Sequence, residues 1–514
     1  MKSPAVTPRD VEREFRADEM FFSTTDTRGI ITAGNGVFVR VSAYRPDELI
    51  GSPHNLVRHP DMPRAAFRLV WDYLEQSRRS VAMVKNLAKD GCNYWVVALF
   101  APAADGYLSI RFKPTGQWRD ELTEVYAAML AEERRQREAG ADEKTGMDAA
   151  AALLRAAVRA RGFADYDEFM RVLLCDELKN RDAVLGRTGG AVVRPLPAGA
   201  ELRGNDDPAR QRLRSLYRHG TQAYASLSRL YARLDEFVAL QQTLASKAGF
   251  VDNLTMELRL AAMNVALASA RLGGEGQSLG VISHHMGDAS SDVAGVVRVL
   301  TSGIQGVSKR LRSVIFNLAA GRLQIEMLLA YVHELLTATA PAEKDRSHHR
   351  LIGLLHQAFD RSLERASTAL HELEDSTREL NPTSRDLGRH ILALHVAQLG
   401  GRVETTRVSE QAGFAAVFTD IGGQIDNTRG QLAGLNDALD QLDSLARETP
   451  AAARDIAGSV RQMEREIAEL GRSEEAAPAA QTVNGPKASL TAGPEATPRS
   501  ARKPGRTERA TILV

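Results

Sequence analysis

A seven-residue repeat of apolar side chains dominates the middle of this 514-residue chain. No proline occurs between residues 209 and 340, and the repeat lies on both sides of a glycine-rich break at residues 273–276. Before the break it consists of Leu216, Ala223, Leu230, Phe237, Leu244, Val251, Leu258, Val265 and Leu272. After the break it continues with Leu279, Met286, Val293, Leu300, Val307 and Val314. This spacing predicts a coiled-coil seam on two helical arms that fold back on each other as an antiparallel hairpin. Each arm would be about 95 Å long at 1.5 Å per residue.

The first 118 residues have a different composition, because they hold all three Trp and half of all aromatic residues. Short apolar runs alternate there with turn signals such as Asp90-Gly91 and Asp105-Gly106. The order of these runs predicts two strands, short helices, a helix from about Pro63 and a three-stranded meander. We therefore expect an α+β domain, an antiparallel sheet with flanking helices, followed by an all-α coiled coil or helical bundle.

The pattern along the chain predicts six regions. They are an N-terminal cap (1–20), the α+β domain (21–118), a helical segment and linker (119–208), the antiparallel hairpin (209–340), a further helical bundle (341–470) and a disordered tail (471–514). The further bundle would be interrupted at Asn381-Pro382 and at Thr449-Pro450, because the residue before a proline avoids the helical conformation.

Composition excludes several classes of protein. A net charge of +1 offers no overall attraction to nucleic acid or to anionic membranes. Cys92 and Cys175 are too few for a disulfide framework and too far apart for a metal-ligand motif. No apolar stretch reaches the roughly 18 residues of a membrane span. The chain also carries no catalytic signature such as a phosphate-binding loop or a zinc-protease motif. We expect a cytoplasmic protein that is not an enzyme and holds no metal.

The densest polar stretch is PHNLVRHPDMP at residues 53–63. It contains His54, Asn55, Arg58, His59 and Asp61. Arginine provides a rigid donor fork for phosphate or carboxylate, and the amide of the nearby Asn35 can donate and accept at once. The set suits a planar ligand that carries phosphate. From these residues alone, a loop-to-helix junction explains the stretch better, with Asp61 as the N-cap and Arg58 paired to it.

A resemblance to a known family favours the ligand site over the capped junction. Residues 22–113 resemble the PAS domains of bacterial aerotaxis receptors. The matching motifs are STTD (23–26), Asn35, Phe38, VS (41–42), EL (48–49), HN (54–55), VRHPDMP (57–63), AAF (65–67), Trp71, VKN (84–86), YWV (94–96) and SIR (109–111). The resemblance implies non-covalent FAD binding and a report on redox state or oxygen. It assigns FAD binding to Arg58, His59 and Asp61, with contributions from Asn35 and Trp71. The rival cofactor is haem, which His54 or His59 would ligate.

Two segments depart from that family. SRRSVA (77–82) replaces a turn in which the family has an aromatic residue, and the final hairpin APAADGYLS is shorter. Both would lie near the cofactor and would change its affinity or potential.

A second resemblance covers residues 263–282, MNVALASARLGGEGQSLGVI, which are similar to the cytoplasmic tip of methyl-accepting chemotaxis proteins. In that family the tip binds the kinase CheA and the coupling protein CheW. The resemblance implies tip contacts for Asn264 and Arg271, with Met256, Leu260 and Met263 on the apolar face. The family's charged tip residues are replaced at Ala268, Gly274, His285 and Gly287. A fainter echo of the tip occurs at residues 403–418.

Together these features predict a soluble sensory receptor for redox state or oxygen, of the aerotaxis type, that forms a homodimer or higher oligomer through its coiled coil. The alternatives are a non-chemotactic PAS scaffold or dimerisation protein with a degenerate output bundle, and a haem-binding PAS sensor.

Overall fold

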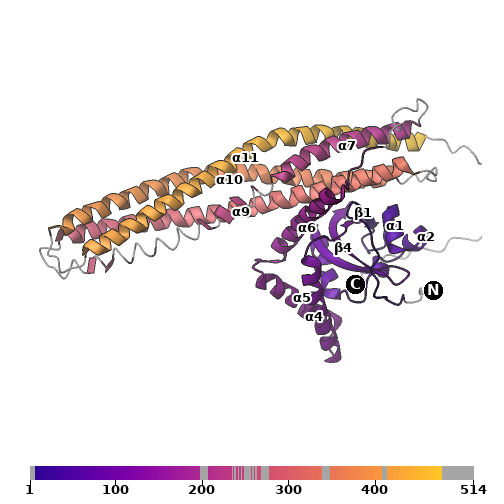
Figure 1. The fold of residues 1–514 in the computed structure, drawn as a ribbon, viewed down its shortest axis with the longest axis horizontal. Coiled ribbons are helices and arrows are strands. Elements are labelled where there is room, and N and C mark those ends of the chain that lie inside the picture. Colours follow the sequence, from indigo (N-terminus) through magenta and orange to yellow (C-terminus); the bar gives the residue numbers. More distant parts are fainter. Residues whose placement is uncertain are drawn as a thin grey trace, which may run out of the picture.

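The computed structural model describes residues 6–196, 207–233, scattered helical positions between 236 and 267, and residues 277–338, 348–407 and 414–476. It contains a sheet domain beside a long helical bundle (Figure 1). The whole glycine-rich break at residues 273–276, together with Arg271, lies outside the described residues.

The N-terminal domain is a five-stranded antiparallel sheet in the order β2-β1-β5-β4-β3. Its strands are β1 (Met20–Thr25), β2 (Ile31–Gly34), β3 (Ser80–Leu87), β4 (Asn93–Ala103) and β5 (Gly106–Phe112). Helices α1 (Gly36–Ser42), α2 (Pro46–Leu49), η1 (His54–Val57) and α3 (Arg64–Glu75) connect β2 to β3. Strands β3, β4 and β5 form the predicted meander, and Gly91 and Gly106 have the positive φ angles that its two turns require. The α+β fold expected from the sequence is confirmed.

Three helices follow the sheet: α4 (Trp118–Glu138), α5 (Glu143–Ala160) and α6 (Tyr166–Thr188). Two tyrosines of this group cover the edge strand β3. The hydroxyl of Tyr126 donates to the carbonyl oxygen of Met83 at 2.8 Å, and that of Tyr166 donates to Val81 at 3.1 Å. These bonds satisfy carbonyl groups that an uncovered edge strand would expose.

The long helices that follow in the described part of the chain are α7 (Pro208–Ala232), α9 (Gln277–Thr337), α10 (His348–Thr405) and α11 (Phe414–Ala476). Helix α9 packs on α10, α10 on α11, α11 on α7, and α7 on α9, which closes a four-helix bundle (Figure 1). The seven-residue rows of α9 are buried as expected, from Leu279 through Val314. The hairpin and the further bundle, which the sequence suggests as successive units, therefore share one core.

Two expected interruptions are wrong. Helix α10 continues through Pro382, and α11 runs across residues 449–450. A proline inside a helix removes one backbone hydrogen bond and costs about 3 kcal/mol. Around Pro382 the side chains of Leu380, Ser384 and Leu387 are all buried in the bundle, and this packing outweighs the cost. Residues 471–476 are helical as well, so they do not belong to a disordered tail; residues 477–514 lie outside the described part.

One described helix, α9, is long and apolar enough to cross a membrane. In its most apolar 18-residue stretch, 89% of the residues are buried against the rest of the protein, as in the core helix of a bundle.

Candidate functional site

The two faces of the sheet have different neighbours, and strand alternation decides which side chains meet on each. Ser23 of β1 lies opposite Ser109 of β5, and Arg111 lies two residues further along β5. Because alternate residues share a face, Thr25, Tyr107, Phe100, Val84 and Asn86 point to the same side. On the opposite face the ring of Phe22 packs edge-on against Tyr331 of α9, with 5.1 Å between centroids.

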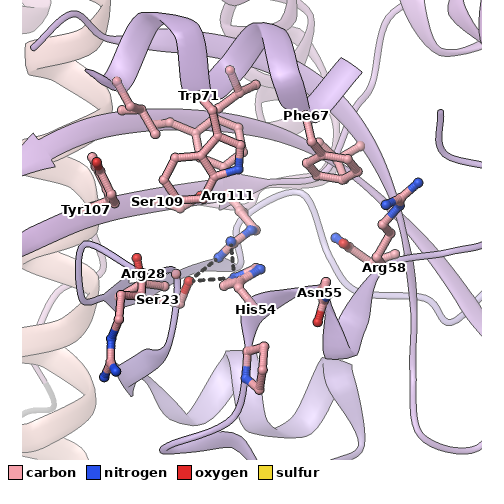
Figure 2. A pocket seen from close by; sticks show the side chains of 18 residues that line it. Ser23, Arg28, His54, Asn55, Arg58, Phe67, Trp71, Tyr107, Ser109 and Arg111 are labelled. Carbon is pink, nitrogen blue, oxygen red and sulfur yellow. Dashed lines mark hydrogen bonds between the residues drawn. The ribbon is translucent and has the colours of Figure 1, made fainter. Parts of the chain in front are cut away.

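The first face closes a cavity under α3 and η1 (Figure 2). The space that the centre of a water molecule can reach amounts to about 120 Å³. Helix α3 contributes Phe67, Val70, Trp71 and Leu74, and the loop before it contributes Pro53, His54, Asn55 and Arg58. The lining is mostly apolar with a few convergent polar groups, which is typical of a small-molecule site.

A polar cluster of three side chains forms the floor of the cavity (Figure 2). The guanidinium of Arg111 donates to the Ser23 hydroxyl at 2.9 Å and contacts Nε2 of His54 at 2.7 Å. Ser23 Oγ lies 3.0 Å from the same Nε2. An arginine has only donors, so Nε2 of His54 accepts, and the ring carries its proton on Nδ1.

Burial sets the charges in this cluster. It lowers the pKa of Arg111 to about 10, which leaves the guanidinium protonated at neutral pH. Burial and the neighbouring Arg111 together lower the pKa of His54 to about 3, so its imidazole is neutral. Arg111 is only 3% exposed, and its partners among the described residues are the neutral Ser23 and His54 and the rings of Phe21 and Phe38. A buried cation thus faces the cavity, and no carboxylate of the described residues pairs with it.

Aromatic side chains form the wall opposite that floor. The indole of Trp71 meets the ring of Tyr107 edge-on at 5.0 Å. At one side Arg58 lies over the ring of Phe67 at 5.4 Å and donates to the carbonyl oxygen of Met62 at 2.9 Å. A planar ligand could lie against the aromatic wall while Arg58 meets an anionic group near the opening.

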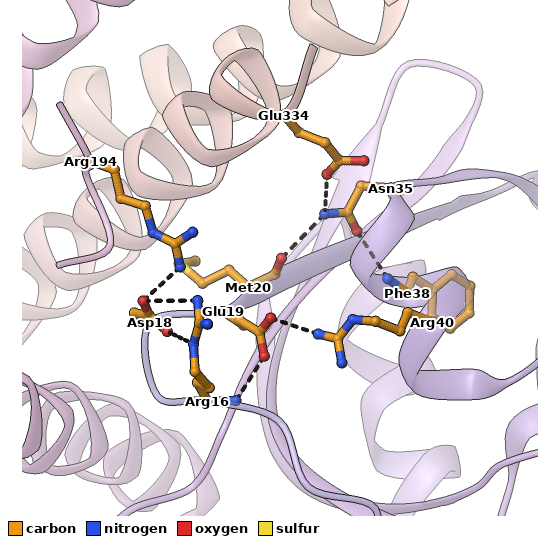
Figure 3. Close-up of polar contacts among 9 residues, drawn as sticks. All are labelled: Arg16, Asp18, Glu19, Met20, Asn35, Phe38, Arg40, Arg194 and Glu334. Atoms are coloured by element: carbon orange, nitrogen blue, oxygen red, sulfur yellow. Dashed lines mark hydrogen bonds and ion pairs between the residues drawn. The ribbon is translucent and has the colours of Figure 1, made fainter. Parts of the chain in front are cut away.

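Of the five residues predicted to bind the cofactor, Arg58 and Trp71 line the cavity. Asn35 does not. It caps the N-terminus of α1, with Oδ1 accepting from the backbone N–H of Phe38 (Figure 3). The same oxygen accepts from the backbone N–H of Phe22. Its Nδ2 donates to the carbonyl oxygen of Met20 and to the carboxylate of Glu334 on α9, each at 3.2 Å. Asn35 therefore joins the sheet to the bundle.

His59 and Asp61 also lie outside the cavity lining. Nδ1 of the buried His59 accepts from the backbone N–H of Asp61 at 3.1 Å, and the Asp61 carboxylate binds Lys85 of β3 at 2.7 Å. These contacts anchor the loop that carries Arg58 to the edge of the sheet. In addition, the N-cap of α3 is Pro63 and not Asp61. The ion pairs of the Asp61 carboxylate are with Lys85 and His59, while Arg58 donates to the Met62 carbonyl. A role of His59 and Asp61 in cofactor binding stays a prediction.

Ser23, Ser109 and Arg111 are cavity residues that were not predicted as site residues. All three lie within the matched motifs STTD and SIR. Strand alternation places Ser109 and Arg111 on the same face of one strand, and this pattern could have indicated them from the sequence. The deviating turn, by contrast, does not line the cavity: Ser77, Arg78 and Arg79 line a separate groove against the bundle.

The predicted tip residues lie at the far end of the bundle. Met256, Leu260 and Met263 occupy helical positions and are 67%, 54% and 53% exposed, and Asn264 is exposed too. A second exposed apolar row with the same spacing lies on the last turns of α10. It comprises Leu392, Val396, Leu399 and Val403. The chain reverses between α10 and α11, at the place of the fainter sequence echo.

Comparison with known proteins supports the first resemblance. Over 119 residues the chain is 42% identical to the aerotaxis receptor of Escherichia coli K12. The match covers 22% of this chain and 24% of that receptor. Among solved structures, the LOV domain of the blue-light photoreceptor Aureochrome1 aligns with 20% of this chain and 87% of its own, at 17% identity and a TM-score of 0.18. No protein-family model matches.

The N-terminal domain is thus a PAS-type domain similar to that of an aerotaxis receptor, and a mostly helical region follows it. The chain spans about a quarter of the length of the curated relative that it matches.

Proposed function

We propose that this protein is a soluble, cytoplasmic receptor that senses redox state or oxygen through FAD bound in the PAS cavity. The observation that carries the proposal is the cavity itself, which lies within the 119 residues similar to an aerotaxis receptor. The protein would act by changing its contacts rather than by turning over a substrate.

The residues of the cavity fit a flavin. The buried Ser109 hydroxyl has no hydrogen-bond partner among the described residues, and Arg111 holds an uncompensated positive charge. Both point to a ligand with acceptor atoms above the floor, because buried polar groups normally find partners. Trp71, Phe67 and Tyr107 offer apolar surface for a planar ring, and Arg58 offers a donor fork for a pyrophosphate.

A bound flavin would supply reversible uptake of electrons and protons. The protein's own residues would respond at the floor. Arg111 stabilises added negative charge nearby, and its bonds to Ser23 and His54 would be redistributed as it does so. Ser23 lies on β1, whose backbone is bonded to Asn35, and Asn35 is bonded to Glu334 of the bundle. A short chain of contacts therefore links the cavity to α9.

Haem suits the cavity less well. Nε2 of His54 is already the acceptor for Arg111 and Ser23, and the guanidinium beside it opposes another cation. His59 lies outside the cavity, and its Nδ1 is engaged with the loop backbone.

The visible absorption spectrum of the purified protein tests the proposal. We expect a flavin spectrum that Arg58→Ala strongly weakens while far-UV circular dichroism stays helical. Arg64→Ala is the matched control, because Arg64 pairs with Glu143 outside the cavity. A colourless protein that takes up no added FAD would contradict the proposal, and a haem spectrum would replace it with the rival.

For the output, we propose that the exposed apolar rows at the far end of the bundle bind a partner of the CheA and CheW type. The four predicted residues at helical positions are all exposed there, and a second row on α10 extends the surface. The scaffold alternative would use the same surface for another partner. Dimerisation stays a prediction, because the seam of α9 is already covered by helices of the same chain.

A further inference from the structure

A groove lies where the PAS domain meets the bundle. Its water-accessible space is about 420 Å³, larger than that of the PAS cavity. Four parts of the chain form it: the turn before β3, α6, α9 and α10. The lining residues with charge are Arg78, Arg79, Asp167, Arg171, Arg365 and Glu372.

Arg79 is the most confined of these charges, with 8% of its surface exposed. Its guanidinium donates to the hydroxyl of Ser362 at 2.6 Å and to the side-chain oxygen of Asn317, and it lies 5.3 Å from the ring centre of Phe316. All of these partners are neutral. Burial, with help from the nearby Arg365 and Arg361, lowers the pKa of Arg79 to about 9, so it is still a cation at neutral pH. A buried charge is costly unless an opposite charge accompanies it.

The two acidic residues of the groove do not provide that charge. Asp167 is bound by Arg78 at 2.5 Å, and Glu372 lies 3.7 Å from Arg310. Arg171 is partly buried, and its Nε has no hydrogen-bond partner among the described residues. Arg365 is exposed and forms no ion pair within the described part of the chain. The charge of Asp167 also reaches Arg171, but among the described residues no salt bridge joins Arg79, Arg171 or Arg365 to a carboxylate of the groove.

We propose that this groove binds a small oxyanion ligand, a phosphate-bearing or carboxylate-bearing molecule, between Arg79, Arg171 and Arg365. Guanidinium groups match such oxygens with paired, charge-assisted hydrogen bonds. Because these arginines come from the PAS domain, α6 and α10, the bound anion fastens the PAS domain to the bundle. It also gives SRRSVA (77–82) a role: Arg78 and Arg79 serve this interface and not the cofactor.

Binding of inorganic phosphate tests the proposal. Isothermal titration calorimetry on the full chain, at constant ionic strength in chloride, should detect phosphate binding. Arg365→Gln and Arg171→Gln should each weaken it at least tenfold. Arg385→Gln is the matched control: it removes the same charge from an exposed position on α10, 20 residues or about 30 Å away, and should leave the affinity unchanged.

Competition titrations with pyrophosphate and citrate separate the two ligand chemistries. If pyrophosphate displaces phosphate more strongly, the groove prefers phosphate-bearing ligands; if citrate does, it prefers carboxylate-bearing ones. Arg365 lies on the surface, so its replacement leaves the buried Arg79 and the fold in place. The proposal is overturned if phosphate does not bind, or if Arg365→Gln and Arg385→Gln bind it equally. The phosphate affinity is measured without reference to FAD content, so this proposal and the proposed redox function can fail independently of each other.

Discussion

At the scale of single residues, the floor of the PAS cavity shows how position alters chemistry. Arg111 and His54 would be ordinary charged or titrating groups on a surface. Buried together beneath α3, Arg111 stays a cation with no carboxylate partner among the described residues, and His54 is held neutral. That state favours a ligand with acceptor atoms, and it also makes the folded protein sensitive to acid.

Acid sensitivity is the expected outcome at His54. Its pKa is about 3 in the folded protein and about 6.5 in an unfolded chain. Between these values only the unfolded state binds the proton, so the free energy of unfolding falls as the pH is lowered. The contribution of His54 is up to about 1.4 kcal/mol per pH unit.

Urea unfolding at a series of pH values measures this dependence. His54→Gln keeps an acceptor for Arg111 but cannot titrate, so its stability should fall less steeply below pH 6.5. His284→Gln, at a side chain that is 79% exposed, should follow the original protein. Parallel curves for the original protein and His54→Gln would refute the assignment.

At the scale of elements, a buried ionic network joins α6 to α9. Arg181 and Glu326 pair with neither side chain exposed, and Arg322 bonds both Glu326 at 2.9 Å and Asp182 at 2.6 Å. Burial alone would raise the pKa of Glu326, but the guanidinium groups of Arg181 and Arg322 outweigh it and lower that pKa below its ordinary value. Since α6 follows the sheet and α9 belongs to the bundle, this network ties the two parts together.

Glu326→Gln should therefore destabilise the protein strongly. It leaves the fully buried Arg181 without its carboxylate, and breaking a buried pair typically costs about 3–5 kcal/mol. Equilibrium urea unfolding measures the loss. Asp386→Asn, which breaks an exposed pair with Arg389 one turn away on α10, should cost less than about 1 kcal/mol. Equal effects of the two substitutions would show that the buried network does not hold α6 to α9.

At the scale of the whole molecule, the sheet lies between its cavity and the bundle. One face carries the Arg111 cluster, and the other packs Phe22 against Tyr331. The carboxylate of Glu334 accepts from the N–H of Gly36 at 2.7 Å, at the N-terminus of α1 (Figure 3). From Glu334 the helix runs 57 residues, about 85 Å, back to its start beside the exposed apolar rows. The contact of α9 with the PAS-type domain and the exposed apolar rows thus lie toward opposite ends of one long helix.

Replacing Met256 and Met263 together by serine should abolish binding to the CheA and CheW pair, because it removes apolar contacts from the predicted tip. The visible spectrum should not change. Val299→Ser is the control, since Val299 is 61% exposed on α9 but lies 22 residues from its start. Co-sedimentation with both partners measures binding. Binding that survives in the double variant would exclude this surface as the partner site.

Much of this architecture follows from local patterns in the sequence. Strand alternation and the turn glycines predicted the sheet, and the seven-residue spacing predicted the buried rows of α9. These features depend on neighbours in sequence, so they can be read without coordinates. The expected breaks at Pro382 and Pro450 are both absent. At Pro382 the reason is the converse one: packing across the bundle outweighs the local cost of proline.

The site shows the same division. Arg58 and Trp71 could be predicted from matched motifs, and the cavity contains both. Ser23, His54 and Arg111 come from three separate segments, and only the folded sheet and its covering loop bring them within hydrogen-bond distance. Asn35 was assigned to the cofactor, yet it caps a helix and reaches Glu334, 299 residues away in the sequence.

The sequence by itself determined the two parts of this protein, an aromatic-rich PAS-type domain and long helices with an apolar seven-residue repeat, because composition and periodicity are local properties. Tertiary structure alone decided how they meet. It closed four helices into one bundle, turned one face of the sheet toward α9, and placed Arg79 against Asn317 and Ser362. The contacts of Arg79 join residues more than 200 positions apart in the sequence. Local sequence patterns do not specify which distant surfaces pack together and bury each other from water.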